Sequence, residues 1–269
     1  MKIGFVVLGL AIQGAAAAAQ SCETYVGQIV APLTFPQALA QIPKIDPKGE
    51  FETTAEFELR NRAAIGGTSK PLVLSKARED IKFFEYDADT QQLGIKTYAF
   101  NNTLFMARDA FYGVEAAKML EPDPLYNFSF VLSSKDTIVG TYDAQNAYGA
   151  KATITKVRRN MEVVFDRGRN YKLDGQSPDL FPAADQSPYM VGFLPLSPAE
   201  AQRLKPILKI AFVIEPKEPF VIENSYLDVE PTISQPREIS VVATVLIADI
   251  KCGLVTDEKN VVLGAYSTR

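Results

Sequence analysis

From Ile81 to the end of the chain, apolar and polar residues alternate in short runs with the two-residue period of β-strands. The clearest pair of runs, IKFFEYD and LGIKTYAF, flanks the turn-forming sequence DADTQQ, a pattern typical of a β-hairpin. One helix interrupts the strands, because residues 197–200 (Ser-Pro-Ala-Glu) form a capping box with proline at the first helical position. The predicted fold class is therefore α+β and mostly β.

Turn-forming residues divide several of these runs. We expect separate strands at NFSFVLS and TIVGTYD, and again at ILKIAFVIE and PFVIENSYL. A tight turn is expected at Arg159 and Asn160, between ATITKV and MEVVFDR.

The chain also repeats itself. Residues 130–139 align with residues 212–221, and residues 115–120 align with residues 200–204. We therefore expect two related units in tandem, each a β-hairpin, a short helix and two strands, over residues 81–166 and 167–269. These units form either two domains or one pseudo-symmetric sheet, and a sandwich-like arrangement is equally compatible because few helices are available to cover a sheet.

Residues 20–80 differ from the rest of the chain. They begin with a proline-rich stretch and continue into a segment that predicts an N-terminal helix, with Phe51, Ala55, Leu59 and Ala63 spaced four apart. The sequence KGEFETTAEFELR within this helix resembles a segment of uncharacterised exported bacterial proteins. The resemblance covers this segment alone, and it implies export but no activity.

Residues 1–19 have the order of a secretory signal peptide. Lys2 is followed by an apolar run and then by small residues up to Ala19, after which we expect cleavage. The apolar run is shorter than the roughly 20 residues that a membrane-spanning helix needs. We expect a periplasmic or secreted protein with no transmembrane segment.

The sequence contains two cysteines, Cys22 and Cys252. An even number of cysteines in an exported protein favours a disulfide bond. Two alternatives stay open: Cys22 carries a lipid anchor, or both thiols are free. A disulfide would join the start of the mature chain to its last strands.

Composition excludes several functional classes. The chain has no histidine and no tryptophan, and its net charge is −4. Without histidine there is no Ser-His-Asp or Cys-His nucleophile system, and most zinc and copper sites are excluded. An acidic chain gains no affinity for nucleic acid from counterion release. We assign no catalytic residue, cofactor or metal ligand.

Two local patterns are candidates for binding. Arg158, Arg159, Arg167 and Arg169 could contact an anion or a partner, although such a cluster is more often a solvated surface. The loop of residues 173–188 could bind a cation or a partner, or could simply connect the two units.

We therefore expect a non-enzymatic, exported binding or scaffold protein of the bacterial cell envelope, whose partner is another envelope protein. One alternative is an envelope-polymer hydrolase that uses carboxylate or Ser/Lys chemistry. Another is a carrier of a small apolar ligand. The sequence does not indicate an oligomeric state.

Overall fold

A computed structural model of the chain describes residues 21–42, 48–65, 70–76, 83–101, 106–107, 126–127, 129–166 and 180–268. The predicted signal peptide lies outside these residues. So do Arg167, Arg169 and the helical segment expected at residues 115–120.

The helices are short. They are the 3-10 helix η1 (Cys22–Tyr25) and the α-helices α1 (Phe35–Leu39), α2 (Thr54–Ile65), α3 (Thr97–Asn101) and α5 (Pro198–Leu204). The predicted start of α5 is confirmed, because Ser197 Oγ accepts a hydrogen bond from the Glu200 amide while the Glu200 carboxylate accepts one from the Ser197 amide. Helix α2 occupies part of the segment for which we expect an N-terminal helix.

Strands make up most of the described chain. They are β1 (Leu72–Ser75), β2 (Phe84–Asp87), β3 (Gln92–Lys96), β4 (Met106–Ala107), β5 (Tyr126–Asn127), β6 (Ser129–Gln145), β7 (Lys151–Asp166), β8 (Met190–Pro195), β9 (Lys209–Val229), β10 (Arg237–Thr256) and β11 (Val262–Ser267). The prediction of an α+β, mostly β protein is confirmed.

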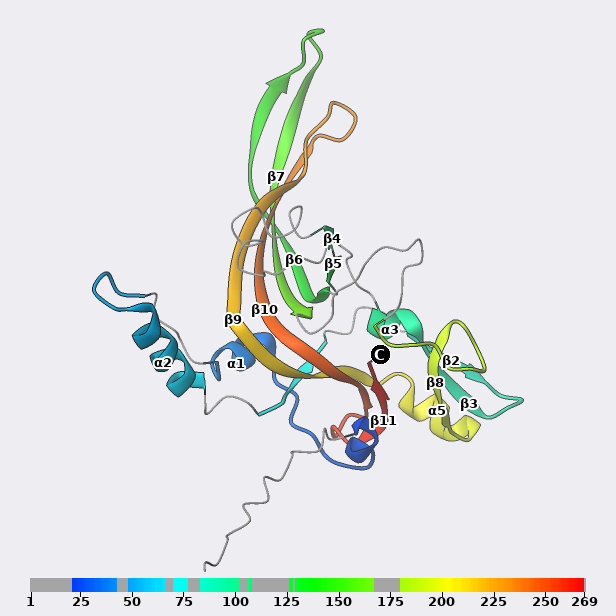
Figure 1. The fold of residues 1–269 in the computed structure, drawn as a ribbon. Coiled ribbons are helices and arrows are strands. Elements are labelled where there is room, and N and C mark those ends of the chain that lie inside the picture. The colour runs from blue at the N-terminus through cyan, green and yellow to red at the C-terminus, as the bar shows by residue number, and fades with distance from the viewer. Residues whose placement is uncertain are drawn as a thin grey trace, which may run out of the picture.

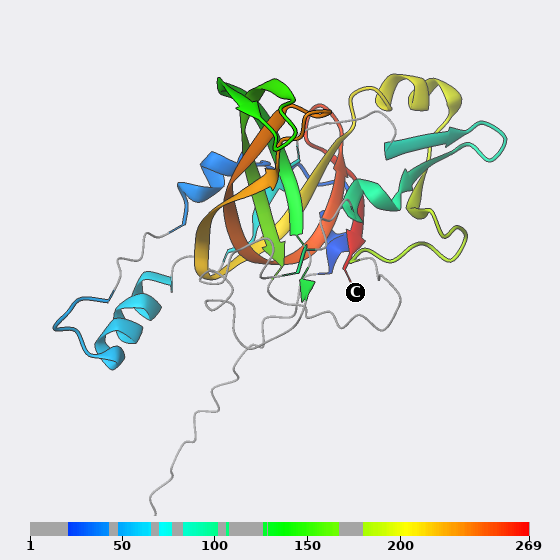
Figure 2. The ribbon, with the colours of Figure 1, turned by 90° about the horizontal axis from the view of Figure 1, so that it is seen from above.

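One large sheet dominates the fold. In the described residues it contains six strands in the order β1-β9-β10-β7-β6, and β11 also pairs with β10. Strands β7 and β10 run parallel, and the other neighbours are antiparallel. The hairpins β6–β7 and β9–β10 extend well beyond the helices (Figure 1), and the sheet is strongly curved when seen from above (Figure 2). A smaller sheet, β2-β3-β8, lies near α3 and α5.

Side chains alternate between the two faces of the large sheet, and residues paired across strands share a face. We call the face that carries Phe130, Phe212 and Leu246 the aromatic face. The face that carries Val213, Val245 and Cys252 is the disulfide face.

The main core lies on the aromatic face, at the end of the sheet near the helices. The Phe212 ring centroid is 4.8 Å from that of Phe130, 5.9 Å from Phe100 and 6.1 Å from Phe181. Gly253 lies directly opposite Phe212 on β10. A Cβ atom at Gly253 would lie 2.5 Å from the Phe100 ring, so only glycine lets this ring approach the sheet.

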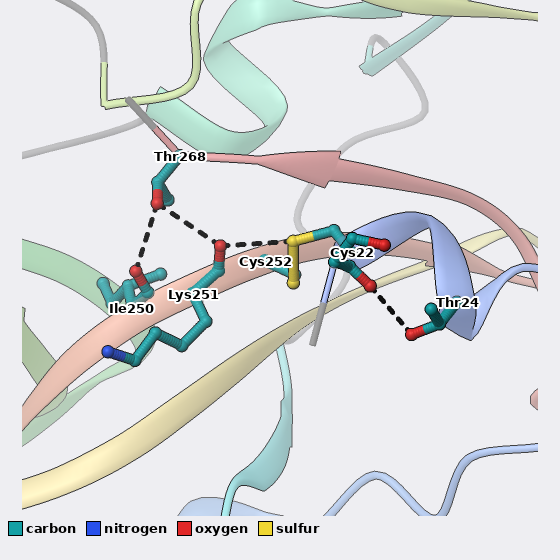
Figure 3. Close-up of a disulfide and its surroundings, with 7 residues drawn as sticks. Cys22, Thr24, Ile250, Lys251, Cys252 and Thr268 are labelled. Atoms are coloured by element: carbon teal, nitrogen blue, oxygen red, sulfur yellow. Dashed lines mark hydrogen bonds between the residues drawn. A yellow bond between two sulfur atoms is a disulfide. The ribbon is translucent and has the colours of Figure 1, made fainter. Parts of the chain in front are cut away.

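The N-terminal residues cover the disulfide face at the same end of the molecule. Cys22 is bonded to Cys252, which confirms the predicted disulfide (Figure 3). The Gly27 amide donates to the Val262 carbonyl and the Val30 amide to the Asn260 carbonyl, so this segment follows the start of β11. Because a lipid would attach to the same sulfur atom, Cys22 in this structure has no thiol for an anchor.

Several predicted turns are wrong. β6 runs without a break through residues 133–136, β7 continues through Arg159 and Asn160, and β9 continues through Pro216 and Pro219. At residues 133–136 and 159–160, pairing with a neighbouring strand outweighs the local preference for a turn, whereas residues 217–220 of β9 have no paired residue on β10 and form a bulge within the strand. The hairpin at residues 87–92 is confirmed, but its second strand ends at Lys96 and the predicted strand residues beyond it form α3.

The tandem arrangement of two units is not confirmed. Strands from both expected units share the large sheet, and β8 from the second pairs with β3 from the first. The hairpin expected from ATITKV and MEVVFDR is the single strand β7.

Candidate functional site

The two long hairpins form a projecting element, which we call the distal arm. It consists of residues 133–145 and 151–162 of β6 and β7, and residues 222–229 and 237–244 of β9 and β10. It lies at the end of the sheet away from the small helices (Figure 1). Four strands from distant parts of the chain therefore act here as one element.

Ion pairs tie the strands of the arm together on the disulfide face. Arg159 on β7 contacts Asp136 on β6 at 2.8 Å and Asp228 on β9 at 3.1 Å. Arg237 on β10 contacts Asp136 at 2.7 Å. The hydrogen bond from Arg159 lowers the pKa of Asp136, so the carboxylate stays ionised at neutral pH.

A second set of contacts links the strands on the aromatic face. Glu238 on β10 accepts a hydrogen bond from the Tyr142 hydroxyl at 2.9 Å and lies 3.6 Å from Lys156 Nζ. The Lys156 ammonium also lies over the Tyr142 ring, 5.4 Å from its centroid. The hydrogen bond with Glu238 contributes most to raising the pKa of Tyr142. Both faces of the arm are thus cross-linked by polar contacts.

The arm exposes several apolar side chains. Tyr148 at the β6–β7 turn is 96% exposed and Ile138 on β6 is 70% exposed. Other exposed apolar side chains of the arm and its turns are those of Val139, Tyr142, Leu227, Ile233 and Val242. Exposed apolar groups gathered on one element are typical of an interaction surface.

The arm also has an open edge. β6 pairs with β7, and no strand of the described chain pairs with its other side. The outer side of β9 pairs with β1 at residues 211–214, and Pro216, Pro219 and a bulge where Phe220 has a φ of 64° follow, so residues 222–229 of β9 form a second edge with no strand of the described chain beside it. β6 contains no proline, although its register shifts at residues 131–133 and 138–140.

The predicted arginine cluster is not assembled in the described residues. Arg158 and Arg159 are neighbours on β7 and therefore point to opposite faces of the sheet. Arg159 forms the ion pairs described above, whereas Arg158 is exposed on the aromatic face. Arg167 and Arg169 lie outside the described residues.

Four charged residues of β9 and β10 form a compact network. Lys217 lies 2.9 Å from Glu215 and 3.4 Å from Asp249, and Lys251 lies 3.2 and 3.1 Å from the same two carboxylates. The hydrogen bond from Lys217 lowers the pKa of Glu215. A general acid needs a raised pKa, so this network does not resemble the catalytic pair of a hydrolase.

Part of the loop expected at residues 173–188 is described. Phe181 is buried in the main core, so this end of the loop is anchored. Asp185 lies on an open pocket of about 670 Å³, together with Glu23, Gln92 and Tyr266. Burial raises the pKa of Tyr266 far above its usual range, which keeps its hydroxyl protonated.

The described residues offer neither a metal-binding cluster nor a membrane-spanning helix. They contain no group of three or more His, Cys, Asp or Glu side chains that could hold a metal ion. None of their helices has the length and apolar character needed to cross a lipid bilayer.

Sequence reasoning missed most of the arm. Asp136, Asp228 and Arg237 carry no local motif, and their contacts depend on strand pairing across 23 to 101 positions. The sequence shows which residues of the predicted strands are charged, but it does not show which of them pair with one another.

Comparison with known proteins identifies no similar protein. No protein-family model, curated protein sequence or solved structure matches the chain significantly. The resemblance of the KGEFETTAEFELR segment to exported bacterial proteins stays a prediction.

Proposed function

We propose that the protein is an exported, non-enzymatic binding or scaffold protein of the bacterial cell envelope, and that the distal arm binds another envelope protein. The observation that carries this proposal is the gathering of exposed apolar side chains, with Ile138 and Tyr148 the most exposed, on a projecting element that ion pairs hold in shape. Isolated exposed apolar residues are normal, but a concentration of them favours an interface.

The rigidity of the arm supports a role in binding. A surface that is already ordered loses less conformational entropy when a partner binds. Arg159 of β7 contacts β9, and Glu238 of β10 contacts β6 and β7, so both residues link the two hairpins and limit their independent movement.

Export is supported by two independent features. The first residues have the pattern of a signal peptide. The Cys22–Cys252 bond is of the kind that persists in oxidising compartments such as the periplasm.

A site-specific crosslinking experiment tests the proposal. A photoreactive amino acid is placed at Ile138 on the arm or, as a matched control, at Ile29 near the disulfide, which is 75% exposed. In intact cells we expect one reproducible crosslinked protein from position 138 and none from position 29. Equal labelling from both positions, or no product from position 138, contradicts the assignment of the arm.

A further inference from the structure

We infer that the outer edge of β6, over residues 133–145, accepts an added β-strand from the partner, and that this strand alternates acidic and apolar side chains. The inference rests on the proposed function and names the chemistry of the partner. It follows from three features of β6: its backbone edge, the charge on one face and the apolar group on the other.

The edge itself has the form that strand addition requires. Residues 134–139 and 141–143 are exposed, and no described strand pairs with this side of β6. The unpaired amide and carbonyl groups of an edge strand can hydrogen bond to an extended segment of another chain. The register is continuous from Ser133 to Ile138, which gives an added strand a regular stretch to pair with.

Positive charge lies beside this edge on the aromatic face. Lys135 on β6 is paired with Asn160, so Arg158, two residues along β7, is its diagonal neighbour, about 7 Å away between Cα atoms. Both side chains are exposed and neither forms an ion pair with a described residue. The nearby Glu162 carboxylate accepts a hydrogen bond from Ser133. Acidic side chains of an added strand would complement Lys135 and Arg158.

The disulfide face beside the same edge favours apolar side chains. The charge of Asp136 is compensated by Arg159 and Arg237. Ile138, two residues further along on the same face, is 70% exposed. Lys135 and Ile138 are three residues apart and on opposite faces, so one strand with alternating acidic and apolar side chains meets both.

A second copy of this chain fits the edge less well. Antiparallel pairing of two β6 edges keeps the aromatic faces on the same side, which brings together two sets of Lys135 and Arg158. Centring the pair on Asp136 would also place two carboxylates opposite each other. Like charges directly opposite destabilise a sheet. The occupant is therefore a different protein with acidic residues.

Binding of synthetic peptides to the whole mature protein tests the inference. The probe is a labelled peptide of about eight residues in which Glu and Val alternate, a length typical of one strand. A peptide with Lys in place of Glu is expected to bind at least ~10-fold more weakly because it repels the basic face. Methylating alternate backbone nitrogens of the Glu/Val peptide, along the edge that faces β6, is expected to weaken binding ~10-fold because it removes hydrogen-bond donors.

Paired protein variants identify the surface. Lys135→Glu/Arg158→Glu is expected to weaken binding of the Glu/Val peptide ~10-fold. The control Lys70→Glu/Lys259→Glu makes the same change in net charge at exposed positions outside the arm and is expected to bind normally. Circular dichroism checks that each variant is folded.

Three results would overturn the inference. The first is equal binding of the Lys and Glu peptides, and the second is unchanged binding after backbone methylation. The third is that Lys135 and Arg158 bind anionic phospholipid vesicles while the protein does not bind the Glu/Val peptide. A crosslinked partner at position 138 without peptide binding would leave the proposed function standing and reject strand addition. Loss of the crosslink with peptide binding retained would reject the proposed function instead.

Discussion

The two ends of the large sheet are stabilised in different ways, although β9 and β10 run through both. We call the end near the helices the base. There, Phe212 packs among other buried rings and the Cys22–Cys252 bond ties the N-terminal segment to β10. In the distal arm the same strands are joined to β6 and β7 by buried apolar side chains such as Val241 and also by ion pairs, while other apolar side chains such as Ile138 are exposed.

The comparison teaches that the disulfide and the main aromatic core lie at the base, whereas exposed apolar side chains and ion pairs that link several strands characterise the arm. Burial of aromatic side chains contributes several kcal/mol each, whereas exposed ion pairs contribute little, about 0.2–1 kcal/mol. The base can therefore hold the fold while the surface of the arm is free to serve a partner. Substitutions in the base should therefore change the free energy of unfolding more than substitutions on the surface of the arm, which should mainly affect binding.

The largest effect is expected in the base. Phe212→Ala removes a ring that contacts three other buried phenylalanines, and should lower the free energy of unfolding by about 3–5 kcal/mol. Denaturant unfolding measures the change. Phe51→Ala is the matched control because Phe51 is 94% exposed, and it should change stability by less than ~0.5 kcal/mol. Similar losses from both variants would show that Phe212 is not central to the core.

The next effect concerns the disulfide. Cys22→Ala/Cys252→Ala opens a link between residues 230 positions apart, and should cost about 2–5 kcal/mol. Hydrogen exchange should show the loss of protection near η1 and β11 before it reaches the tip of the arm. Reductant should destabilise the unmodified protein and leave the double variant unchanged. Protection lost first in β6 would contradict the division into base and arm.

The arm should lose a small amount of stability in acid. The hydrogen bond from Arg159 lowers the pKa of Asp136 below its usual 3.8. A carboxyl group with a depressed pKa stabilises the folded state above its unfolded pKa, and this contribution is lost as pH falls through the folded pKa. Because the Asp136 side chain is 35% exposed, we expect no more than ~1 kcal/mol. Unfolding measured between neutral pH and pH 3 should show it, and Asp136→Asn should abolish this part of the pH dependence.

The same division explains what could be predicted from the sequence. The disulfide, the hairpin at residues 87–92 and the start of α5 depend on cysteine count or on a few adjacent residues, and all three are confirmed. The turn-like residues 133–136 instead lie within β6, because pairing with β7 outweighs local preference, and residues 216–219 lie within β9 next to a bulge where its register with β10 shifts. The site on the arm depends on the same long-range pairing, so the sequence identified Arg158 and Arg159 but not their different surroundings.

The smallest expected effect separates these two neighbouring arginines. Arg159→Ala breaks contacts with Asp136 and Asp228 and should cost up to ~1 kcal/mol at low ionic strength, less at high salt. Arg158→Ala removes an exposed side chain without an ion pair to any described residue, so the free energy of unfolding should change by less than ~0.5 kcal/mol. Chemical unfolding at two salt concentrations measures both. If Arg158→Ala proved as destabilising as Arg159→Ala, and as sensitive to salt, then Arg158 would belong to the stabilising network and would not be available to a partner. If only Arg159→Ala is destabilising, the two faces of β7 have different roles. The face with Arg159 stabilises the arm, and the face with Arg158 carries an exposed positive charge.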